Sequence, residues 1–351
     1  MFSRRAIGLD IADHTIEVVE LEPSFFSSTP ALVSRARMPL EKGIVEHGRL
    51  MNRKGLLDAL ATLWRNTSHQ PLSPNAVIVG IPERQVYTSV VTLETVQGST
   101  LNDQIREYAL ETIPLEKDDL TFSFKVISKT AQAYDVMIYG TSREVLGEWR
   151  DFFDNSPYHV QAFDHELLAG IRGLFGKQPH PSVCIVDCGA ERTKIAIYSS
   201  HGLGYVHSLE IAGDFFTEQI AKTRDVSKEE ADRIKKEEGM EPVSHRVLFE
   251  KLLQPIIDEI TIAREYFEKN AHERVNEIIL IGGSARLKGL VDYIQETTGI
   301  RARQGVSFIS FPRSRTEDSD QLHYIEAIGL ALKGIQPRIW EAEHPSFHLE
   351  E

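Results

Sequence analysis

Two aspartates in this chain stand where a side chain could do chemistry. Asp10 and Asp187 each end a short apolar run, a tight turn follows, and a threonine (Thr15 or Thr193) opens a second run rich in β-branched residues. In such a hairpin the aspartate presents a carboxylate at the edge of a sheet, and small residues in the turn let an anion approach the backbone N–H groups closely. The pattern therefore favours the binding of a metal-bound phosphate.

One hairpin of this kind is weak evidence, because turns commonly use Gly and Asp for geometry alone. Here the two copies lie about half a chain apart. The repetition predicts two pseudo-equivalent lobes that face a shared cleft.

Two further stretches could complete an anion site. The turn 212–214 precedes a predicted helix, whose N-terminus would offer free N–H groups and a partial positive charge. An apolar run at 277–281 leads into Gly282, Gly283 and Ser284. Glycines at such a junction let a ligand lie flat against the backbone, and we expect Ser284 to cap a helix.

Lys235 and Lys236 lie on a helix predicted from Ser227 to Glu238, which a capping box at its start supports. Lysines on such a helix are most often solvated. The alternative hypothesis is that one of them reaches a bound nucleotide.

Length and composition limit the class of protein. A chain of 351 residues is too long for one simple core, and its net charge of −13 disfavours nucleic acid and anionic lipid as nonspecific partners. No apolar run approaches the roughly 18 to 20 residues that a membrane helix needs. Cys184 and Cys188 are about 13 Å apart on one predicted strand, too far for a disulfide, and a zinc site lacks further ligands.

The remaining pattern predicts the elements that position these residues. Other strands are expected at 32–37, 76–82, 85–94, 120–128 and 134–139. Helices are expected at 50–64, 100–112, 142–153, 163–174, 244–269 (kinked or split at Pro255) and 321–334. Residues 83–160 form a separate small α/β module, and Asp164 is expected to be the N-cap of the helix at 163–174.

These elements, in this order, resemble the actin-like ATPase superfamily over nearly the whole chain. The matching motifs are two phosphate hairpins (Asp10–Thr15 and Asp187–Thr193), an adenosine motif (278–290) and two connecting helices (163–174 and 324–334). Within the superfamily the chain is most similar to the PilM family of type IV pilus assembly and next to the FtsA family. The segments that carry this similarity are 7–21, 227–239, 279–290 and 324–334.

The resemblance implies an α/β, two-lobed actin-like ATPase (ribonuclease H-like) fold with an inserted 1C subdomain of the FtsA/PilM type. The implied parts are a first lobe 1A (1–82), the 1C subdomain (83–160), a connecting helix (161–180), a second lobe 2A (181–225 and 278–320), a helical subdomain 2B (226–277), a returning helix (321–335) and a polar, disordered tail (336–351).

The resemblance also implies a site for ATP or ADP with Mg²⁺. Asp10 and Asp187 would hold the Mg²⁺, largely through water. The implied nucleotide-binding residues are Asp10, Ala12, Asp13, His14, Thr15, Asp187, Gly189, Ala190, Glu191 and Thr193 on the hairpins, and Gly213, Lys235, Gly282, Gly283 and Ser284 around the ribose and base. Asp164 matches the position that orients an attacking water, as an alternative to its role as N-cap.

The implied function is that of a cytoplasmic ATP-binding scaffold in the inner-membrane assembly complex of type IV pili. It would bind the N-terminal cytoplasmic tail of a PilN-like membrane protein at a groove of the 1C subdomain and reach the membrane only through partners. Pilus motor components and further copies of the chain are additional candidate partners. Nucleic acid is not.

Three alternatives stay open. They are a nucleotide-free interaction domain like that of GspL, an FtsA-like cell-division protein, and an ATP-hydrolysing enzyme. The chain departs from the family pattern at Ala12, where the family has Gly, and at Glu17, where it often has Lys. These departures favour weak or no ATPase activity.

Overall fold

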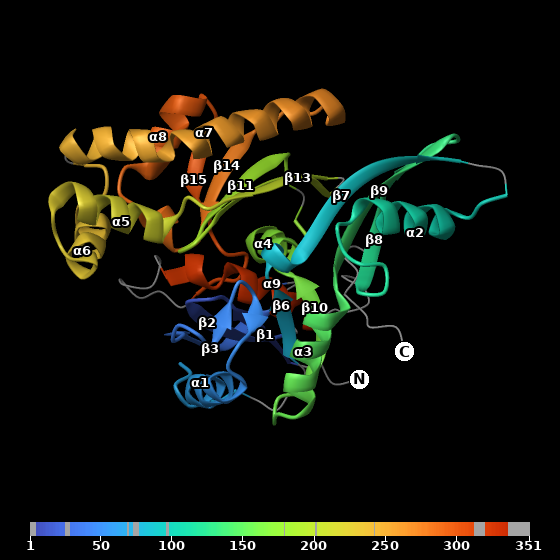
Figure 1. Cartoon of the computed structure of the whole chain (residues 1–351), viewed down its shortest axis with the longest axis horizontal. Coiled ribbons are helices and arrows are strands. Elements are labelled where there is room, and N and C mark those ends of the chain that lie inside the picture. Colours follow the sequence, from blue (N-terminus) through green and yellow to red (C-terminus); the bar gives the residue numbers. More distant parts are fainter. Residues whose placement is uncertain are drawn as a thin grey trace. The chain divides into compact units, whose positions relative to one another are not determined.

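The structure, a computed structural model, describes residues 5–24, 29–68, 70–72, 77–95, 98–178, 180–200, 202–241, 243–311 and 320–335. The chain divides into two compact units. Unit 1 comprises Met1–Lys177, Ser307–Ser314 and Tyr324–Glu351, and unit 2 comprises Gln178–Val306 and Arg315–His323. Each unit is a mixed α/β structure (Figure 1). The predicted tail at 336–351 lies outside the described residues.

A five-stranded sheet in unit 1 carries the first hairpin. Its strands, in spatial order, are β10 (Val160–His165), β6 (Val77–Ile81), β1 (Ala6–Ile11), β2 (Thr15–Glu22) and β3 (Ala31–Pro39). Strand β1 pairs antiparallel with β2 and parallel with β6. Every residue of β1 is buried, as expected for a central strand covered on both faces. Asp10 therefore stands near the end of a core strand.

Unit 2 repeats this arrangement with the second hairpin. Its strands are β13 (Gly202–Leu209), β12 (Thr193–Ser199), β11 (Val183–Cys188), β14 (Glu277–Ile281) and β15 (Ala302–Gln304). Strand β11 pairs antiparallel with β12 and parallel with β14. The two hairpins thus occupy the same place in two sheets of the same connectivity, which confirms the predicted pseudo-equivalence of the two hairpins.

Helices cover these sheets. The helices of unit 1 outside the inserted module are α1 (Arg53–Arg65), α4 (Glu166–Phe175) and α9 (Ile325–Ile335); those of unit 2 are α5 (Gly213–Arg224), α6 (Lys228–Glu238), α7 (Val243–Ala271) and α8 (Leu290–Thr298). Short 3₁₀ turns are η1 (Glu83–Gln85), η2 (Gly283–Arg286) and η3 (Asp320–His323). Within the described part of the chain, no helix combines the length and the apolar character needed to cross a membrane.

The inserted module is built on a three-stranded sheet. Its strands are β7 (Val86–Glu94), β9 (Ala133–Ser142) and β8 (Leu120–Lys129), in the order β7-β9-β8, and its helices are α2 (Leu101–Thr112) and α3 (Arg143–Asp154). Ile105 and Ala109 of α2 pack against Val136 and Ile138 of the central strand. A small ribbon, β4 (Val45–Glu46) and β5 (Arg49–Leu50), belongs to the same unit.

The prediction of one helix over residues 163–174 is wrong in its first part. Val160–His165 is strand β10, which pairs in parallel with β6, and the helix begins only at Glu166. Asp164 is therefore not the N-cap. His165 takes that position, and its ring nitrogen Nδ1 accepts a hydrogen bond from the backbone N–H of Leu167 at 3.2 Å.

Three smaller predictions also need correction. Ser284 caps no helix, because Gly282 precedes η2 and no side-chain cap is present. The last helix begins at Ile325, after the 3₁₀ turn η3. Pro255 does not split α7, which runs unbroken from Val243 to Ala271.

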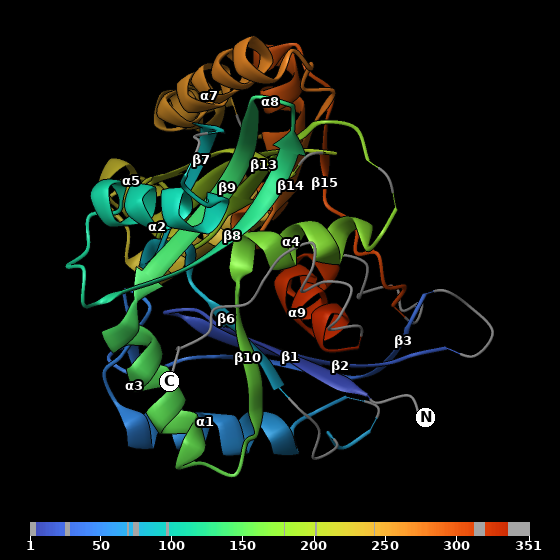
Figure 2. The ribbon, with the colours of Figure 1, turned by 90° about the vertical axis from the view of Figure 1, so that its right-hand side faces the viewer.

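Helices α4 and α9 lie side by side over the first sheet (Figure 2). Glycines make this close packing feasible. A Cβ on Gly329 of α9 would lie 1.8 Å from the carbonyl oxygen of Ala169, and a Cβ on Gly173 of α4 would lie 1.9 Å from that of Ile325. A methyl group at either position would therefore push the helices apart.

We expect Gly329→Ala to lower the free energy of unfolding by about 1–3 kcal/mol or more, because backbone cannot move away as a flexible side chain can. Gly147→Ala on α3 is the matched control, since a Cβ there meets nothing within 4 Å. The control should be stabilised by about 0.5–1 kcal/mol. Urea unfolding followed by circular dichroism compares them, and equal midpoints would contradict the packing argument.

Candidate functional site

The second hairpin forms the centre of the candidate site in unit 2. The N–H of Gly189 donates to the carbonyl of Arg192 at 3.0 Å and closes the turn, while Ala190 and Glu191 are exposed. Thr193 is fully buried, and its hydroxyl donates to the carbonyl of Ile211 at 2.6 Å. The one hydroxyl proton of Thr193 is thus used by the backbone, so the exposed part of the turn is the part that a ligand can reach.

Residues far apart in the sequence meet this turn. A Cβ on Gly213 would lie 2.6 Å from the hydroxyl oxygen of Ser284 and 3.2 Å from the carbonyl oxygen of Gly189. The Ser284 hydroxyl itself donates to Gly189 O at 3.1 Å. Gly282 has φ +81°, and a Cβ there would lie 2.4 Å from Oδ1 of Asp187. Unit 2 therefore brings Asp187, Gly189, Gly213, Gly282 and Ser284 together, in a cradle with no room for larger side chains.

The start of helix α5 is less open than expected. The N–H groups of Gly213 and Asp214 donate to the carbonyls of Gly189 and Ala190 at 3.1 and 2.8 Å. Two of the N–H groups at the helix N-terminus, where free donors were predicted, are therefore used by the hairpin turn. Lys235 of α6 reaches the same place, where its ammonium donates to Gly213 O at 2.9 Å and to the Thr217 hydroxyl at 2.7 Å. Lys235 is thus an anchored side chain, whereas Lys236 is largely exposed.

A cation that the sequence reasoning missed stands next to Asp187. Asp187 and Lys194 face each other across β11 and β12, and Lys194 Nζ lies 3.1 Å from Asp187 Oδ2. The exposed fractions of the two side chains are only 16% and 9%. The pairing could have been found from the hairpin itself, because residues directly opposite in an antiparallel pair point to the same face.

The first hairpin presents its predicted residues in one turn of unit 1. The N–H of Ala12 donates to the carbonyl of Thr15 at 2.9 Å, and Ala12 does not have a positive φ, so its methyl group causes no backbone strain. Asp13 caps the neighbouring turn: its carboxylate accepts from the N–H groups of His47 at 2.8 Å and Gly48 at 3.0 Å. The carbonyl of His14 accepts from Leu40 at 2.8 Å.

Asp10 lies among further carboxylates of unit 1. Carboxylate oxygens of Asp10, Glu166 and Glu326 all lie within 4.8 Å of one another. Glu166 also accepts a hydrogen bond from the N–H of Glu83 at 2.7 Å. Such a group of oxygen ligands fits a divalent cation such as Mg²⁺. Glu166 and Glu326 were not predicted, since only the folded chain brings positions 10, 166 and 326 together.

Glu17 faces Asp10 across the first hairpin and carries the clearest pKa shift in unit 1. Burial, and secondly the charge of Asp10, raise the pKa of Glu17 from 4.5 to about 8. Arg37 of β3 opposes this shift with an ion pair of 2.6 Å to Glu17 Oε1. Since desolvation and the Asp10 charge outweigh the arginine, the direction of the pKa shift is upward.

Asp164 is held in a buried ion network. Its carboxylate pairs with the Arg172 guanidinium and, at 2.9 Å, with the Lys333 ammonium. The exposed fractions of all three side chains are between 0 and 2%. Arg172 Nε also donates to the carbonyl of Gly329 at 3.1 Å. The network joins β10, α4 and α9. Asp164 therefore has a structural role.

A protein-family model matches nearly the whole chain. Residues 8–335 match the family model described as "Type IV pilus assembly protein PilM". Among curated relatives, cell division protein FtsA of Streptococcus pneumoniae is 22% identical over 190 residues, which cover 48% of this chain and 42% of that protein. The chain thus spans less than half the length of the curated relatives it matches.

Solved structures show the same fold. A PilM-PilN type IV pilus biogenesis complex contains a chain similar at a TM-score of 0.81 and 19% identity, covering 96% of this chain and 100% of that chain. MreB5 of Spiroplasma citri, crystallised with AMPPNP, is similar at a TM-score of 0.50 and 13% identity, with coverages of 98% and 97%. The fold is therefore that of the actin-like ATPases, as predicted.

The raised pKa of Glu17 makes stability depend on pH. The folded chain keeps a proton on Glu17 that the unfolded chain loses, so stability should fall as pH rises from about 4.5 to about 8, by at most about 1.4 kcal/mol per pH unit. Glu17→Gln removes this titration. We expect the variant and the parent protein to be equally stable near pH 4.5, and the variant to become the more stable one as pH rises. A difference in thermal midpoint that stays constant over this range would contradict the shift.

Proposed function

Because the chain belongs to the family of the type IV pilus assembly protein PilM, we propose that it is a nucleotide-binding scaffold in an inner-membrane assembly complex of type IV pili. The observation that carries the proposal is the family match over residues 8–335. The scaffold would work in the cytoplasm and reach the membrane through partner proteins. Motor components of the pilus and further copies of the chain are additional candidate partners.

The cradle in unit 2 supports binding of ATP or ADP. Ala190 and Glu191 expose the hairpin turn, and Gly213, Gly282 and Gly283 keep side chains away from the backbone around it. Phosphate would approach the turn, and the ribose and base would lie along Gly282, Gly283 and the anchored Lys235. MreB5, which was crystallised with AMPPNP, has a similar fold, and this supports a nucleotide as the ligand here.

In unit 1, Asp10 is the residue that would hold Mg²⁺. Glu166 and Glu326 would join it, since their oxygens lie close to its own. When bound, Mg²⁺ would neutralise phosphate charge. The chain's own contribution is to fix the three carboxylates on β1, α4 and α9, with the backbone N–H of Glu83 orienting Glu166.

We propose that turnover is weak or absent. Asp164, the residue expected to orient an attacking water, is buried and paired with Arg172 and Lys333. A carboxylate held in this way has no access to water. Binding without hydrolysis suits a scaffold, and it separates this proposal from the alternative of an ATP-hydrolysing enzyme.

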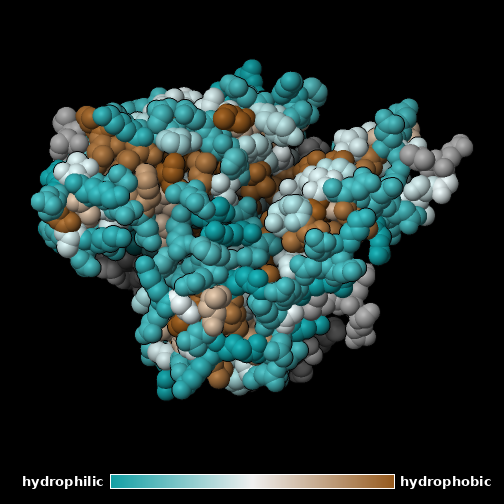
Figure 3. All heavy atoms as spheres, viewed as in Figure 1, coloured by the Kyte–Doolittle hydropathy of each residue, from teal (hydrophilic) through white to brown (hydrophobic). Residues whose placement is uncertain are grey.

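The second part of the proposal is that the inserted module binds the cytoplasmic tail of a PilN-like protein, the partner in the similar solved complex. Strand β7 is an edge strand of the module and exposes Tyr87 and Val90, with exposed fractions of 40% and 43%. Hydrophobic residues are visible around this module, at the right of the space-filling view (Figure 3). An exposed edge strand with apolar side chains can accept an extended peptide.

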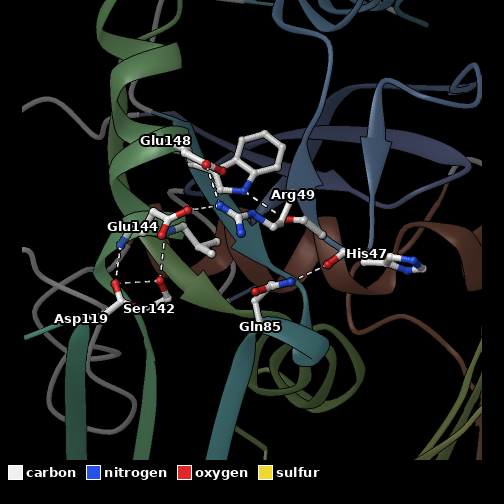
Figure 4. Close-up of polar contacts among 10 residues, drawn as sticks. His47, Arg49, Gln85, Asp119, Ser142, Glu144 and Glu148 are labelled. Carbon is white, nitrogen blue, oxygen red and sulfur yellow. Dashed lines mark hydrogen bonds and ion pairs between the residues drawn. The ribbon is translucent and has the colours of Figure 1, made fainter. Parts of the chain in front are cut away.

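Helix α3 of the module is attached to the β4–β5 ribbon of the same unit, which supports the use of the module as a docking platform. Arg49 of β5 points at two carboxylates of α3, Glu144 and Glu148, and Glu148 lies 2.7 Å away (Figure 4). Next to this pair, the Trp149 indole donates to the carbonyl of Gly48 at 3.2 Å. Ion pairs and a buried indole thus hold α3 against the β4–β5 ribbon.

Calorimetry with ATP and Mg²⁺ tests the nucleotide part of the proposal. Ala190→Asp places a negative charge on the exposed turn and should weaken ATP binding at least about tenfold through repulsion of the phosphates. Ala271→Asp, at another exposed alanine, the last residue of α7, is the control. If the parent protein takes up no ATP, or if both variants bind equally well, the cradle is not a nucleotide site.

Fluorescence anisotropy with a labelled peptide tests the partner. The peptide is the N-terminal cytoplasmic tail of a PilN-like protein. We expect Val90→Asp to weaken its binding about tenfold or more, because the charge would be desolvated against the peptide. Val247→Asp, on an exposed valine of α7, should have no effect. If the two variants bind the peptide with equal affinity, the tail does not bind at strand β7.

A further inference from the structure

The two hairpins carry opposite charges at the same register. Asp10 faces Glu17 across β1 and β2, and Asp187 faces Lys194 across β11 and β12. Each facing residue is the seventh after its aspartate and projects from the same side of the sheet as that aspartate. Unit 1 thus places a second acid beside its strand-end carboxylate, and unit 2 places an amine there.

One carboxylate oxygen of Asp187 is paired with a lysine, and the other lies close to backbone. Oδ2 lies 3.1 Å from the Lys194 ammonium. Oδ1 faces the backbone at Gly282, where even a Cβ would lie 2.4 Å away. The pair is more than four-fifths buried on both sides. Separating it would leave a charge without a partner in a site of low polarity, which is costly.

A metal ion does not fit against Asp187 while this pair is in place. Mg²⁺ needs six oxygen ligands at about 2.0–2.1 Å and keeps most of them as water. An ammonium at hydrogen-bond distance occupies that position, and it already supplies the positive charge. Asp10 has Glu17 as its cross-strand neighbour and lies close to Glu166 and Glu326, and such a group of carboxylates is the better ligand for a divalent cation.

An anion, in contrast, fits the same turn. Among the described residues, Arg192 Nε is buried and has no hydrogen-bond partner. The only ion pair recorded for Arg192 in this part of the chain is a long one, 3.4 Å to the exposed Glu210. A buried donor without a partner costs stability, which an incoming acceptor would restore. The turn between Asp187 and Lys194 therefore carries two cationic side chains, and the buried nitrogen of one of them has no acceptor.

We infer that Lys194 takes the place of a divalent cation at Asp187 and binds the nucleotide phosphate directly. The inference rests on the proposed nucleotide binding. It changes the role of Asp187 from metal ligand to the residue that positions the Lys194 ammonium. The ligand of the turn in unit 2 is thus a phosphate bound by an amine, and the carboxylates around Asp10 in unit 1 are the candidate metal ligands.

The two roles of Asp187 predict opposite effects on the metal dependence of binding. If Asp187 positions Lys194, Asp187→Asn leaves the ratio of ATP affinities with Mg²⁺ and with EDTA as it is in the parent protein. If Asp187 is a metal ligand, the ratio falls at least about tenfold. Loss of the ammonium in Lys194→Met should weaken ATP binding about tenfold with and without Mg²⁺, because a hydrogen bond to a charged group is removed.

The experiment is calorimetric titration of the full chain with ATP, in Mg²⁺ and in EDTA. Lys194→Arg keeps the charge and should retain binding. The double variant Asp187→Asn with Lys194→Met leaves no lone buried charge, so it guards against a folding defect and should bind as weakly as Lys194→Met. Lys222→Met is the control, since Lys222 is exposed on α5 and pairs only with Glu218 among the ion pairs recorded in the described residues.

Each outcome decides the inference. An unchanged Mg²⁺ to EDTA ratio in Asp187→Asn, with weaker binding in Lys194→Met and the double variant, supports it. A lower ratio in Asp187→Asn, or full affinity in Lys194→Met, overturns it and leaves the nucleotide site standing. No ATP binding by the parent protein under either condition overturns the proposed nucleotide binding itself, and the inference with it.

Discussion

Carboxylates that are taken out of water need a positive charge beside them, and this requirement organises both halves of the molecule. At the end of β11, Asp187 has the Lys194 ammonium as its partner. At the end of β1, Asp10 lies among Glu17, Glu166 and Glu326, and Glu17 pairs with Arg37. Unit 1 is therefore rich in acid and suited to a metal ion, whereas unit 2 carries its own cation and is suited to phosphate.

The fold holds these groups by dense packing rather than by flexible loops. Gly329 and Gly173 let α9 and α4 approach each other closely, and the buried ion network of Asp164, Arg172 and Lys333 ties both helices to β10. Glu166 and Glu326 stand on the same two helices. Any change that separates α4 from α9 would thus also disperse the carboxylates around Asp10.

Local pattern predicted the parts of the fold that depend on local sequence. Both hairpins, the module strands and the Gly282 junction follow from short apolar runs and turn residues. Strand β10 was missed because its pairing with β6 is a long-range contact that overrides the helical spacing after Phe163. The pair of Asp164 with Lys333 and the grouping of Asp10 with Glu166 and Glu326 bring together residues more than 150 positions apart, so periodicity could not find them. The pairing of Lys194 with Asp187 could have been predicted from the sequence, because the hairpin alone sets the register of the two residues.

The division between a metal-binding unit 1 and a phosphate-binding unit 2 is the central claim, and Mn²⁺ tests it most directly. Electron paramagnetic resonance counts the Mn²⁺ ions bound by the full chain in the presence of ATP. The account predicts that Asp10→Asn loses the bound ion and that Asp187→Asn keeps it. Loss of the ion in Asp187→Asn, with retention in Asp10→Asn, would contradict the account.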